Sequence, residues 1–497
     1  MKKRLHRIDL FLKHPSEVQN ELIMNLVQKA QYTEWGVKYD YKSIKRINEF
    51  KSRVPISRYE DLKPVFDRIY RGEENLLWPG EMNFFAKSSG TTAGKSKLIP
   101  VSKEALEDCH FQGGKDLLAM YVRSNENSKV YAGNTLVVGG SGQECEYRSN
   151  AYYGDLSAII MSNLPLWVQA RRVPSLSIAL MDDWEQKIDQ LAESTMNKNV
   201  SVLSGVPSWM LIMIKRILEI KGVDSIAEVW PNLELFMHGG VNFEPYRKQY
   251  NALIPKKGMN YYQTYNASEG FFSIQDDNAT DDMLLMLDYG IFYEFIPLDQ
   301  IHDENPKTVL LDEVEVGKNY ALVISTNAGL WRYLIGDTVC FTSKSPYKIR
   351  VTGRTKHFIN AFGEELIIDN AEKGLKIACE KTNAIITEYT AGPIFMSDLA
   401  GGGHEWIVEF EEKPDCLNRF VEIFDKALME LNSDYEAKRS YKGNLAQPLI
   451  HSVEKGTFYK WMKGRNKLGG QNKVPRLAND RKYVDDILMM VQKNVYA

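Results

Sequence analysis

Cysteine is scarce in this sequence: five occur in a chain of 497 residues, and no two of them form a Cys-x-x-Cys pair. Their odd number and wide spacing argue against a disulfide framework and against a zinc site. The pair His404-Glu405 also lacks the second histidine of a zinc-protease motif. We therefore expect reduced, mostly buried thiols in a cytoplasmic protein.

Long apolar runs and a strong net charge are also missing. The strongest apolar run, residues 209–214, is far shorter than the roughly 20 residues of a membrane-spanning helix, and Lys215 follows it at once. The net charge is −3 at neutral pH, which gives no general attraction to nucleic acid or to anionic lipid. We expect neither a membrane nor a nucleic-acid partner.

Two common catalytic loops are absent. A Walker phosphate loop has four residues between its glycines and opens a helix. Here Gly90 and Gly94 enclose three residues, and Pro100 stands five residues after Lys95, where that helix would run. No G-x-S-x-G sequence marks a serine hydrolase. The pattern argues against a P-loop ATPase, which would require a helix beginning at Lys95.

A polar stretch rich in serine, threonine and glycine is present instead. Residues 87–97 read Lys-Ser-Ser-Gly-Thr-Thr-Ala-Gly-Lys-Ser-Lys and lie between two apolar runs, residues 82–86 and 98–101, which we interpret as strands. Small residues let backbone N–H groups approach a phosphate closely, and hydroxyl groups suit its oxygens. The alternative is a flexible surface loop. The candidate phosphate-binding residues are Ser88, Ser89, Gly90, Thr91 and Thr92.

Strands alternate with helices through the middle of the chain, which is typical of βαβ units and a largely parallel sheet. Buried strands are expected, with helices between them, at residues 135–140, 200–205, 233–237 and 258–265. Short strands and turns from residue 284 to residue 351 predict an antiparallel or barrel-like section. The last 150 residues are long enough for a separate, smaller α+β domain.

Two of the expected strands end in polar turns that contain glycine. Ligands bind beyond the carboxyl ends of strands in open α/β sheets, so these turns are candidates for one site. Glycines there would let a flat base lie against the backbone, Tyr265 would stack on it, and Glu269 is an oxygen ligand suited to Mg²⁺. The alternative for Glu269 is an acid at a helix start. The residues concerned are Gly239, Gly240, Tyr265, Asn266, Ala267, Ser268 and Glu269.

A third candidate segment, residues 332–337, reads Arg-Tyr-Leu-Ile-Gly-Asp and follows an expected strand. A carboxylate such as that of Asp337 can accept hydrogen bonds from both ribose hydroxyls, as the acid of a dinucleotide-binding fold does. The alternative is an ordinary Gly-Asp hairpin turn.

Taken in order, residues 88–95, residues 265–270 and residues 332–337 resemble the ATP- and AMP-binding motifs of the auxin-responsive acyl-acid amido synthetases. That family belongs to the adenylate-forming superfamily, which includes firefly luciferase and acyl-CoA synthetases. The order and spacing match over nearly the whole chain, and the three motifs together are far more specific than any one of them.

The resemblance implies an α/β fold with two domains. The large N-terminal domain, residues 1–343, would bind ATP and the acyl substrate on parallel sheets with flanking helices and a barrel-like section. The small α+β domain, residues 344–497, would be a mobile lid. Lys356 stands in the segment that resembles the superfamily's hinge motif, at a position where many members have aspartate.

The resemblance also implies the chemistry. Mg²⁺ and ATP would activate a carboxylic acid as an acyl-adenylate, and an amine, usually of an amino acid, would then form an amide. Lys473 lies in a segment similar to the one that bears the catalytic lysine, Glu269 would bind the metal, and Arg354 would contact ribose or phosphate. An acyl-CoA ligase and a non-catalytic nucleotide-binding relative are the alternatives. The identity of the acid, the acyl pocket and the oligomeric state are not predicted.

Overall fold

The structure of the chain is a computed structural model. It describes residues 2–92, 95–145, 148, 150–181, 183–240, 243–301, 303, 305–355, 358–359, 366–394, 402–432, 435–436, 439, 445–465, 467–468, 473–478 and 480–495. Among the helices in these ranges, none combines the length and the apolar character needed to cross a lipid bilayer.

The larger part of the chain is built on one mixed sheet, which has eleven strands within the described residues. Five neighbouring strands are parallel and follow one another in the order β9-β8-β7-β3-β6. They are β3 (Asn134–Val138), β6 (Arg172–Val173), β7 (Val200–Gly205), β8 (Leu235–Gly239) and β9 (Asn260–Ala267). The predicted parallel sheet is confirmed, including the strand expected at residues 200–205.

The same sheet continues with antiparallel strands, as the sequence predicts for this region. They are β10 (Gly270–Gln275), β11 (Met283–Leu285), β12 (Ile291–Pro297), β13 (Asn319–Thr326), β14 (Tyr333–Lys344) and β15 (Tyr347–Arg354). Because β10 pairs with β9, the antiparallel section extends the parallel one and is not a separate barrel within the described residues. The expected domain boundary at 343/344 falls at the end of β14, next to the turn of the β14–β15 hairpin, and residues up to Arg354 lie in the large sheet.

A second, four-stranded sheet carries the Ser/Thr/Gly stretch. Its strands, in the order β2-β1-β5-β4, are β1 (Phe84–Thr92), β2 (Lys95–Val101), β4 (Gly142–Glu144) and β5 (Tyr152–Asp155). Pairing of β1 with β2 includes Ser88 with Lys97 and Thr92 with Lys95, so most of the stretch expected as a loop is hairpin strand. Residues 93–94 lie outside the described residues. A strand begins at Lys95 where a Walker loop would need a helix.

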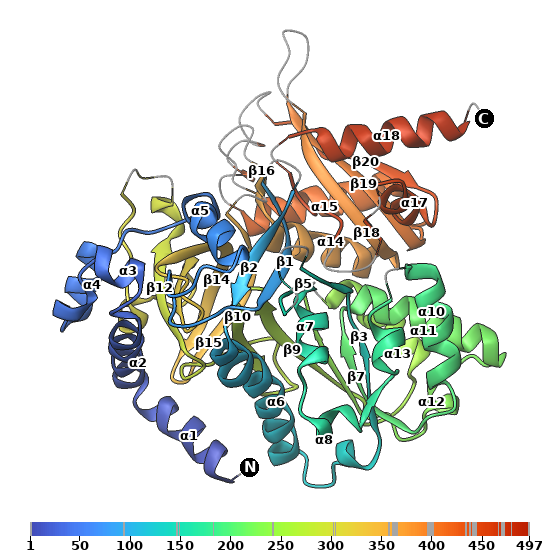
Figure 1. Ribbon diagram of the computed structural model, residues 1–497. Helices are drawn as coiled ribbons and strands as arrows, with labels where there is room; N and C mark the ends of the chain where they lie inside the picture. Colours follow the sequence, from blue (N-terminus) through green and yellow to red (C-terminus); the bar gives the residue numbers. More distant parts are fainter. Residues whose placement is uncertain are drawn as a thin grey trace.

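Helices cover the sheets of the large domain (Figure 1). They are α1 (Lys2–Lys13), α2 (Pro15–Ala30), α3 (Glu34–Lys38), α4 (Ile47–Arg53), α5 (Tyr59–Tyr70), α6 (Phe111–Ser124), α7 (Leu156–Ser162), α8 (Leu166–Gln169), α9 (Leu176–Ala179), α10 (Trp184–Thr195), α11 (Pro207–Lys221), α12 (Ile226–Val229) and α13 (Glu244–Leu253). Helix α11 illustrates how the sequence sets the ends and the buried face of such a helix. Proline begins it, Gly222 ends it with φ +65°, and Met210, Ile214 and Ile217 form one fully buried face.

The C-terminal part is a smaller α+β unit with its own core, as expected. Its strands are β16 (Phe358–Ile359), β17 (Leu366–Ile367), β18 (Ile385–Ile394), β19 (Gly403–Glu412) and β20 (Leu449–Val453), and its helices are α14 (Ile368–Thr382), α15 (Leu417–Leu431), α17 (Thr457–Gly464) and α18 (Lys482–Val495). Trp406 of β19 packs edge-on against Phe424 of α15, with ring centroids 4.8 Å apart. Both side chains are fully buried, so helix and sheet share one apolar core.

The C-terminal unit lies against helices of the large domain. Figure 1 shows it above the green helices, and α13 packs against β18. Glu185 of α10 forms an ion pair of 2.6 Å with Lys463 of α17, and Lys248 of α13 lies 3.6 Å from Glu412 at the end of β19. The structure therefore has one defined arrangement of the two parts.

Candidate active site

The carboxyl ends of β8 and β9 lie side by side, because Gly239 pairs with Thr264. The backbones are so close there that a Cβ atom on Gly239 would lie 2.7 Å from the Thr264 carbonyl oxygen. Gly240 has φ +82°, a conformation that L side chains rarely adopt. The two glycines thus form a bare backbone edge, and Asn266 stands exposed next to it at the end of β9.

Ser268 and Glu269 form the two-residue turn between β9 and β10, since Ala267 pairs directly with Gly270. The alternative of a helix start at Glu269 is therefore wrong. Both residues of the turn are buried, with 6% and 8% of their surface exposed. Burial raises the pKa of the Glu269 carboxyl, and the nearby Asp337 carboxylate adds to this rise.

Asp337 joins three strands of the site. One carboxylate oxygen accepts a hydrogen bond of 2.8 Å from the Tyr265 hydroxyl of β9, and the other lies 2.8 Å from Nε of Arg354 on β15. The Tyr265 ring is buried and packs on Phe272, at a centroid distance of 4.7 Å. Tyr265 therefore orients Asp337 in this structure, whereas the sequence suggested that its ring would stack on a base.

The position of Asp337 depends on an irregularity in β14. Asp337 pairs with Arg354 at the end of the β14–β15 ladder farthest from its turn, so the alternative of an ordinary Gly-Asp hairpin turn is wrong. On the other side, the pairing with β13 shifts register between Ala321 and Val323. Gly336 takes φ +94° at this bulge, and its carbonyl accepts a hydrogen bond of 2.8 Å from the Thr355 amide. A bulge re-aims neighbouring side chains, which suits a ligand site.

Lys473 enters this group from the C-terminal unit. Its ammonium group donates a hydrogen bond to the Gly240 carbonyl oxygen. The side chain is partly exposed to solvent, but surrounding protein atoms reduce the solvation of its charged end. This desolvation, together with the positive charge of Arg354, lowers the pKa of Lys473 to about 8. Asp337 opposes the lowering. The structure thus brings a cation from the small domain to the glycine edge of the large sheet.

The β1–β2 hairpin approaches the same group through Lys97. The Lys97 ammonium lies over the Tyr59 ring, 5.1 Å from its centroid, and its charge acts on Glu269, where it partly opposes the raised pKa. Ser88, Ser89, Gly90, Thr91 and Thr92 all lie in β1, and only their backbone is described. The sequence does not predict the surroundings of Lys97, because nothing local in the sequence indicates that Tyr59, at the start of α5, lies under its side chain.

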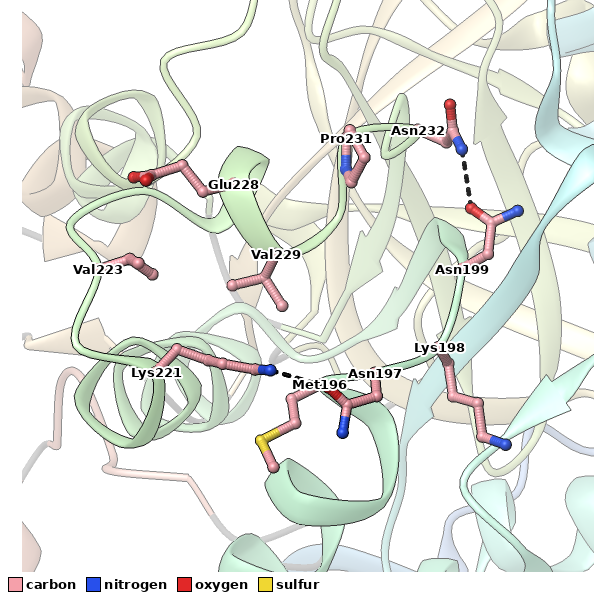
Figure 2. A pocket seen from close by; sticks show the side chains of 10 residues that line it. All are labelled: Met196, Asn197, Lys198, Asn199, Lys221, Val223, Glu228, Val229, Pro231 and Asn232. Atoms are coloured by element: carbon pink, nitrogen blue, oxygen red, sulfur yellow. Dashed lines mark hydrogen bonds between the residues drawn. The ribbon is translucent and has the colours of Figure 1, made fainter.

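A surface pocket lies elsewhere on the parallel sheet. Figure 2 shows an open surface pocket of about 440 Å³, lined among others by Asn199 and Asn232. These residues precede β7 and β8, so the pocket lies at the amino ends of strands whose carboxyl ends carry the candidate site. Lys356, the expected hinge residue, lies outside the described residues.

Family models match almost the whole chain. The model of the GH3 family N-terminal domain matches residues 4–259, that of the GH3 family central domain residues 284–354, and that of the GH3 family C-terminal domain residues 369–482. The central match ends at the last residue of β15, where the large sheet also ends.

Curated relatives of similar length carry related names. Indole-3-acetic acid-amido synthetase GH3.3 of Arabidopsis thaliana is 24% identical, over 96% of this chain and 92% of the relative. Jasmonoyl-L-amino acid synthetase GH3.5 of Oryza sativa subsp. japonica is 23% identical, over 99% and 97%.

Solved structures share the fold. The chain superposes on a GH3.15 acyl acid amido synthetase with a TM-score of 0.81 at 16% identity, covering 98% of this chain and 96% of the other. A 2-hydroxyisobutyryl-CoA ligase in its postadenylation state has a TM-score of 0.59 at 12% identity, covering 96% and 91%. The chain therefore belongs to the GH3 family, and it is an ATP-using, adenylate-forming ligase of the acyl-acid amido synthetase type.

Proposed function

We propose that this protein condenses a small carboxylic acid with the amino group of an amino acid, through an acyl-adenylate bound at the group formed by Gly240, Glu269, Asp337, Arg354 and Lys473. The single observation that supports this site best is the meeting of Lys473 with Gly240, beside the Asp337–Arg354 pair. A cation from one domain thus reaches the glycine edge at the carboxyl ends of strands from the other.

In the first step, a carboxylate oxygen of the acid attacks the α-phosphorus of ATP, and the bond between that phosphorus and the pyrophosphate oxygen breaks. Negative charge builds on the α-phosphoryl oxygens as this happens. The Lys473 ammonium has three N–H donors, of which Gly240 takes one, so it can donate to those oxygens. The backbone N–H groups of the β1–β2 hairpin are the proposed partners of the outer phosphates.

Asp337 is the proposed ribose ligand. Each of its carboxylate oxygens has further lone pairs beyond the bonds to Tyr265 and Arg354. The two neighbours hold the carboxylate in one orientation before nucleotide arrives. The Gly239–Gly240 edge and Asn266 are the proposed neighbours of the base, together with Ala267 and Ser268 of the turn.

Glu269 is the proposed ligand of Mg²⁺, and its surroundings suit that role. Its carboxyl is buried, has its pKa raised, and has no cation in an ion pair among the described residues. No group of three His, Cys, Asp or Glu side chains that could hold a metal is found in the described part of the chain. Proteins usually hold Mg²⁺ with one or two carboxylates together with substrate phosphates. At this site the ion would neutralise phosphate charge.

In the second step, the amine nitrogen attacks the activated carbonyl carbon. The bond from that carbon to the AMP oxygen breaks, the nitrogen loses a proton, and the products are an amide and AMP. Arg172 is not a proposed partner for the acceptor carboxylate: it lies on the edge strand β6, away from β8 in the strand order, and its buried guanidinium donates to the Pro174 carbonyl.

The mobile unit, in this proposal, begins after Arg354 and not at residue 344. Two facts support this: β15 is held in the large sheet, and the core of the C-terminal unit begins with Ile359. Lys356 lies between these two points in the sequence, so it keeps its proposed role as the hinge.

A cytoplasmic location is also proposed, because all five cysteines are free thiols.

The decisive experiment is pyrophosphate release from Mg·ATP with a panel of aryl, indolyl and aliphatic acids, each tested with and without an amino-acid mixture and with coenzyme A. Acid-dependent release that rises with amino acids is expected. A rise with coenzyme A alone would make the protein an acyl-CoA ligase, an activity found in a protein of the same fold.

Two variants test the site within that assay. Lys473→Ala is expected to slow acid-dependent pyrophosphate release by about 10²–10³, the effect typical of removing a group that stabilises transition-state charge. Lys467→Ala is the matched control, because it removes a neighbouring lysine from the same domain. Wild-type rates in Lys473→Ala would contradict the role of Lys473 and leave the family assignment intact.

A further inference from the structure

The chain that follows Lys473 is fixed to the small domain as an extra edge of its sheet. The Ala391 amide of β18 donates a hydrogen bond of 2.9 Å to the Arg476 carbonyl, and the Ala478 amide donates one of 3.0 Å back to Ala391. The Thr390 hydroxyl donates to the Pro475 carbonyl at 2.6 Å. Lys473 therefore projects from a segment whose next residues move with β18.

The Arg476 side chain strengthens this attachment. Its guanidinium donates to the Glu388 carboxylate and lies over the Tyr389 ring, 4.6 Å from the centroid. Glu372 of α14 lies 3.8 Å from its Nε and also accepts a hydrogen bond of 2.9 Å from the Tyr389 hydroxyl. Only 14% of the Arg476 side chain is exposed, so these contacts lie mostly away from water.

The same guanidinium also reaches the large domain. Its second terminal nitrogen lies 3.5 Å from the hydroxyl oxygen of Tyr246 on α13, in hydrogen-bond geometry. Tyr246 has 2% of its surface exposed, and its ring belongs to the core behind the parallel sheet. Arg476 is thus in contact with both domains, three residues from the lysine that reaches Gly240.

We propose that Arg476 is a positioning residue for the adenylation step: it sets the reach of Lys473 and, through Tyr246, stabilises the domain arrangement in which Lys473 meets Gly240. Three residues of extended chain span at most about 10 Å, so a loosened anchor at Arg476 displaces the ammonium group directly. This inference rests on the proposed function, because it concerns the step assigned there to Lys473.

The contacts of Arg476 within the small domain and its contact with Tyr246 lead to different predictions. The bonds of Arg476 to Glu388, Tyr389 and Glu372 lie within the small domain and persist wherever that domain moves. The bond to Tyr246 exists only in the arrangement seen here. Loss of the Tyr246 hydroxyl should therefore slow adenylation and spare the later attack of the amine on a preformed acyl-adenylate.

The test measures the two half-reactions separately in rapid-quench experiments on the full-length protein, with an acid that the wild type adenylates. Arg476→Lys is expected to slow acyl-adenylate formation about 10-fold, because lysine cannot bind Glu388 and Tyr246 together, and Tyr246→Phe about 2- to 5-fold. The fall should appear in kcat more than in the KM for ATP. Conversion of synthetic acyl-adenylate to amide should stay within about 2-fold of the wild type.

Arg439→Lys is the matched control. Arg439 binds Asp425 and the Leu445 carbonyl inside the same small domain, so its replacement tests the general effect of losing a guanidinium ion pair there. Its adenylation rate should equal that of the wild type. Equal slowing of both half-reactions by Arg476→Lys and Tyr246→Phe, or slowing of neither, would overturn the proposal.

A substrate-free measurement separates this inference from the proposed function. Hydrogen exchange at the Ala391 and Ala478 amides should become faster in Arg476→Ala than in the wild type, because the edge segment loses its anchor. Unchanged exchange would overturn the anchoring role. If the wild type releases no pyrophosphate with any acid, the proposed function fails, while the exchange result still decides whether Arg476 anchors the segment.

Discussion

Asp337 has a structural role in the observed fold and a ligand-binding role in the proposed function. One oxygen is held by Tyr265 of β9 and the other by Arg354 of the neighbouring strand β15, so its orientation is set before any nucleotide binds. A carboxylate that is already oriented loses little side-chain freedom when it accepts ribose hydroxyls. This preorganisation is the reason to expect a large effect from a single substitution.

Replacing Asp337 with alanine is expected to weaken AMP binding by about 10- to 100-fold, the loss typical of hydrogen bonds to a charged group. Isothermal titration calorimetry measures this. Asp282→Ala is the control, because it also removes a carboxylate that pairs with an arginine of β15, Arg350, at a position outside the proposed site. AMP affinity equal in Asp337→Ala and the wild type would refute the ribose assignment.

The lowered pKa of Lys473 gives a pH dependence. The proposed role needs the charged ammonium, which in the free enzyme loses its proton as pH rises through about 8. We expect kcat/KM for ATP in acid-dependent pyrophosphate release to fall above that pH, since this parameter reports groups of the free enzyme. In Lys473→Arg the fall should move to higher pH, because arginine keeps its charge; an unmoved profile would assign the fall to another group.

Glu269 and Lys97 show what the sequence can and cannot predict about the placement of single side chains. The sequence predicts that Glu269 follows a strand, and the structure confirms this. The sequence does not distinguish a two-residue turn from a helix start there, because both can begin with small polar residues. Whether Lys97 faces solvent or Tyr59 depends on a helix about forty residues earlier in the chain. Such pairings arise from packing of distant elements and have no periodic signal.

Among the elements, the start of β14 depends on a buried ion pair. Arg332 has φ +43°, and both of its Glu294 contacts measure 2.9 Å. Its other nitrogen donates to the carbonyls of Lys51 and Val54, at the end of α4. The motif arginine thus ties α4 to the strand that carries Asp337, a structural task that the motif alone did not indicate.

Arg332→Met is expected to lower the free energy of unfolding by about 3–5 kcal/mol, because it leaves the buried Glu294 carboxylate without its cation, with only the Thr308 hydroxyl as a hydrogen-bond donor. Urea unfolding followed by near-ultraviolet circular dichroism measures this. The double variant Arg332→Met with Glu294→Gln should recover most of the loss, since no charge is then left buried. A double variant as unstable as the single one would show that the carbonyl contacts dominate.

Hairpins were the hardest elements to place from the sequence. The sequence predicts an antiparallel region for β14 and β15, yet the expected boundary at 343/344 treats residues 343–348 as a connector between domains. Its lysines and proline suit a tight turn as well as a linker, and only the pairing from Asp337–Arg354 to Lys344–Tyr347 decides between them. The parallel strands β3, β7 and β8 were easier, because each is a largely buried run that ends in glycine or is followed by it.

At the scale of the whole molecule, exposed charges contribute to the arrangement of the two domains. Glu185 of α10 binds Lys463 and accepts a hydrogen bond of 3.1 Å from the Tyr459 hydroxyl, both on α17. Exposed ion pairs of this kind contribute at most about 1 kcal/mol each, so they adjust the balance between domain arrangements and do not fix it.

Glu185→Lys is expected to slow adenylation about 2- to 5-fold, by placing like charges across the interface, and the added Lys463→Glu exchange should restore the rate. The measurement is single-turnover pyrophosphate release at low ionic strength, with the defect shrinking as salt is added. Asp189→Lys is the control: it makes the same charge change on α10, where Asp189 pairs with Arg216 inside the large domain. Failure of the exchange to restore the rate would contradict direct pairing.

The order of the parts along the chain also matters while the protein is being made. The sheets that carry the proposed nucleotide ligands are complete at Arg354, whereas Lys473 lies near the C-terminus. A chain emerging from the ribosome therefore contains the proposed nucleotide-binding residues before it contains the proposed catalytic cation. If the proposed roles hold, incomplete chains would bind ATP but form the mixed anhydride, which would acylate nearby amines, far more slowly than finished molecules.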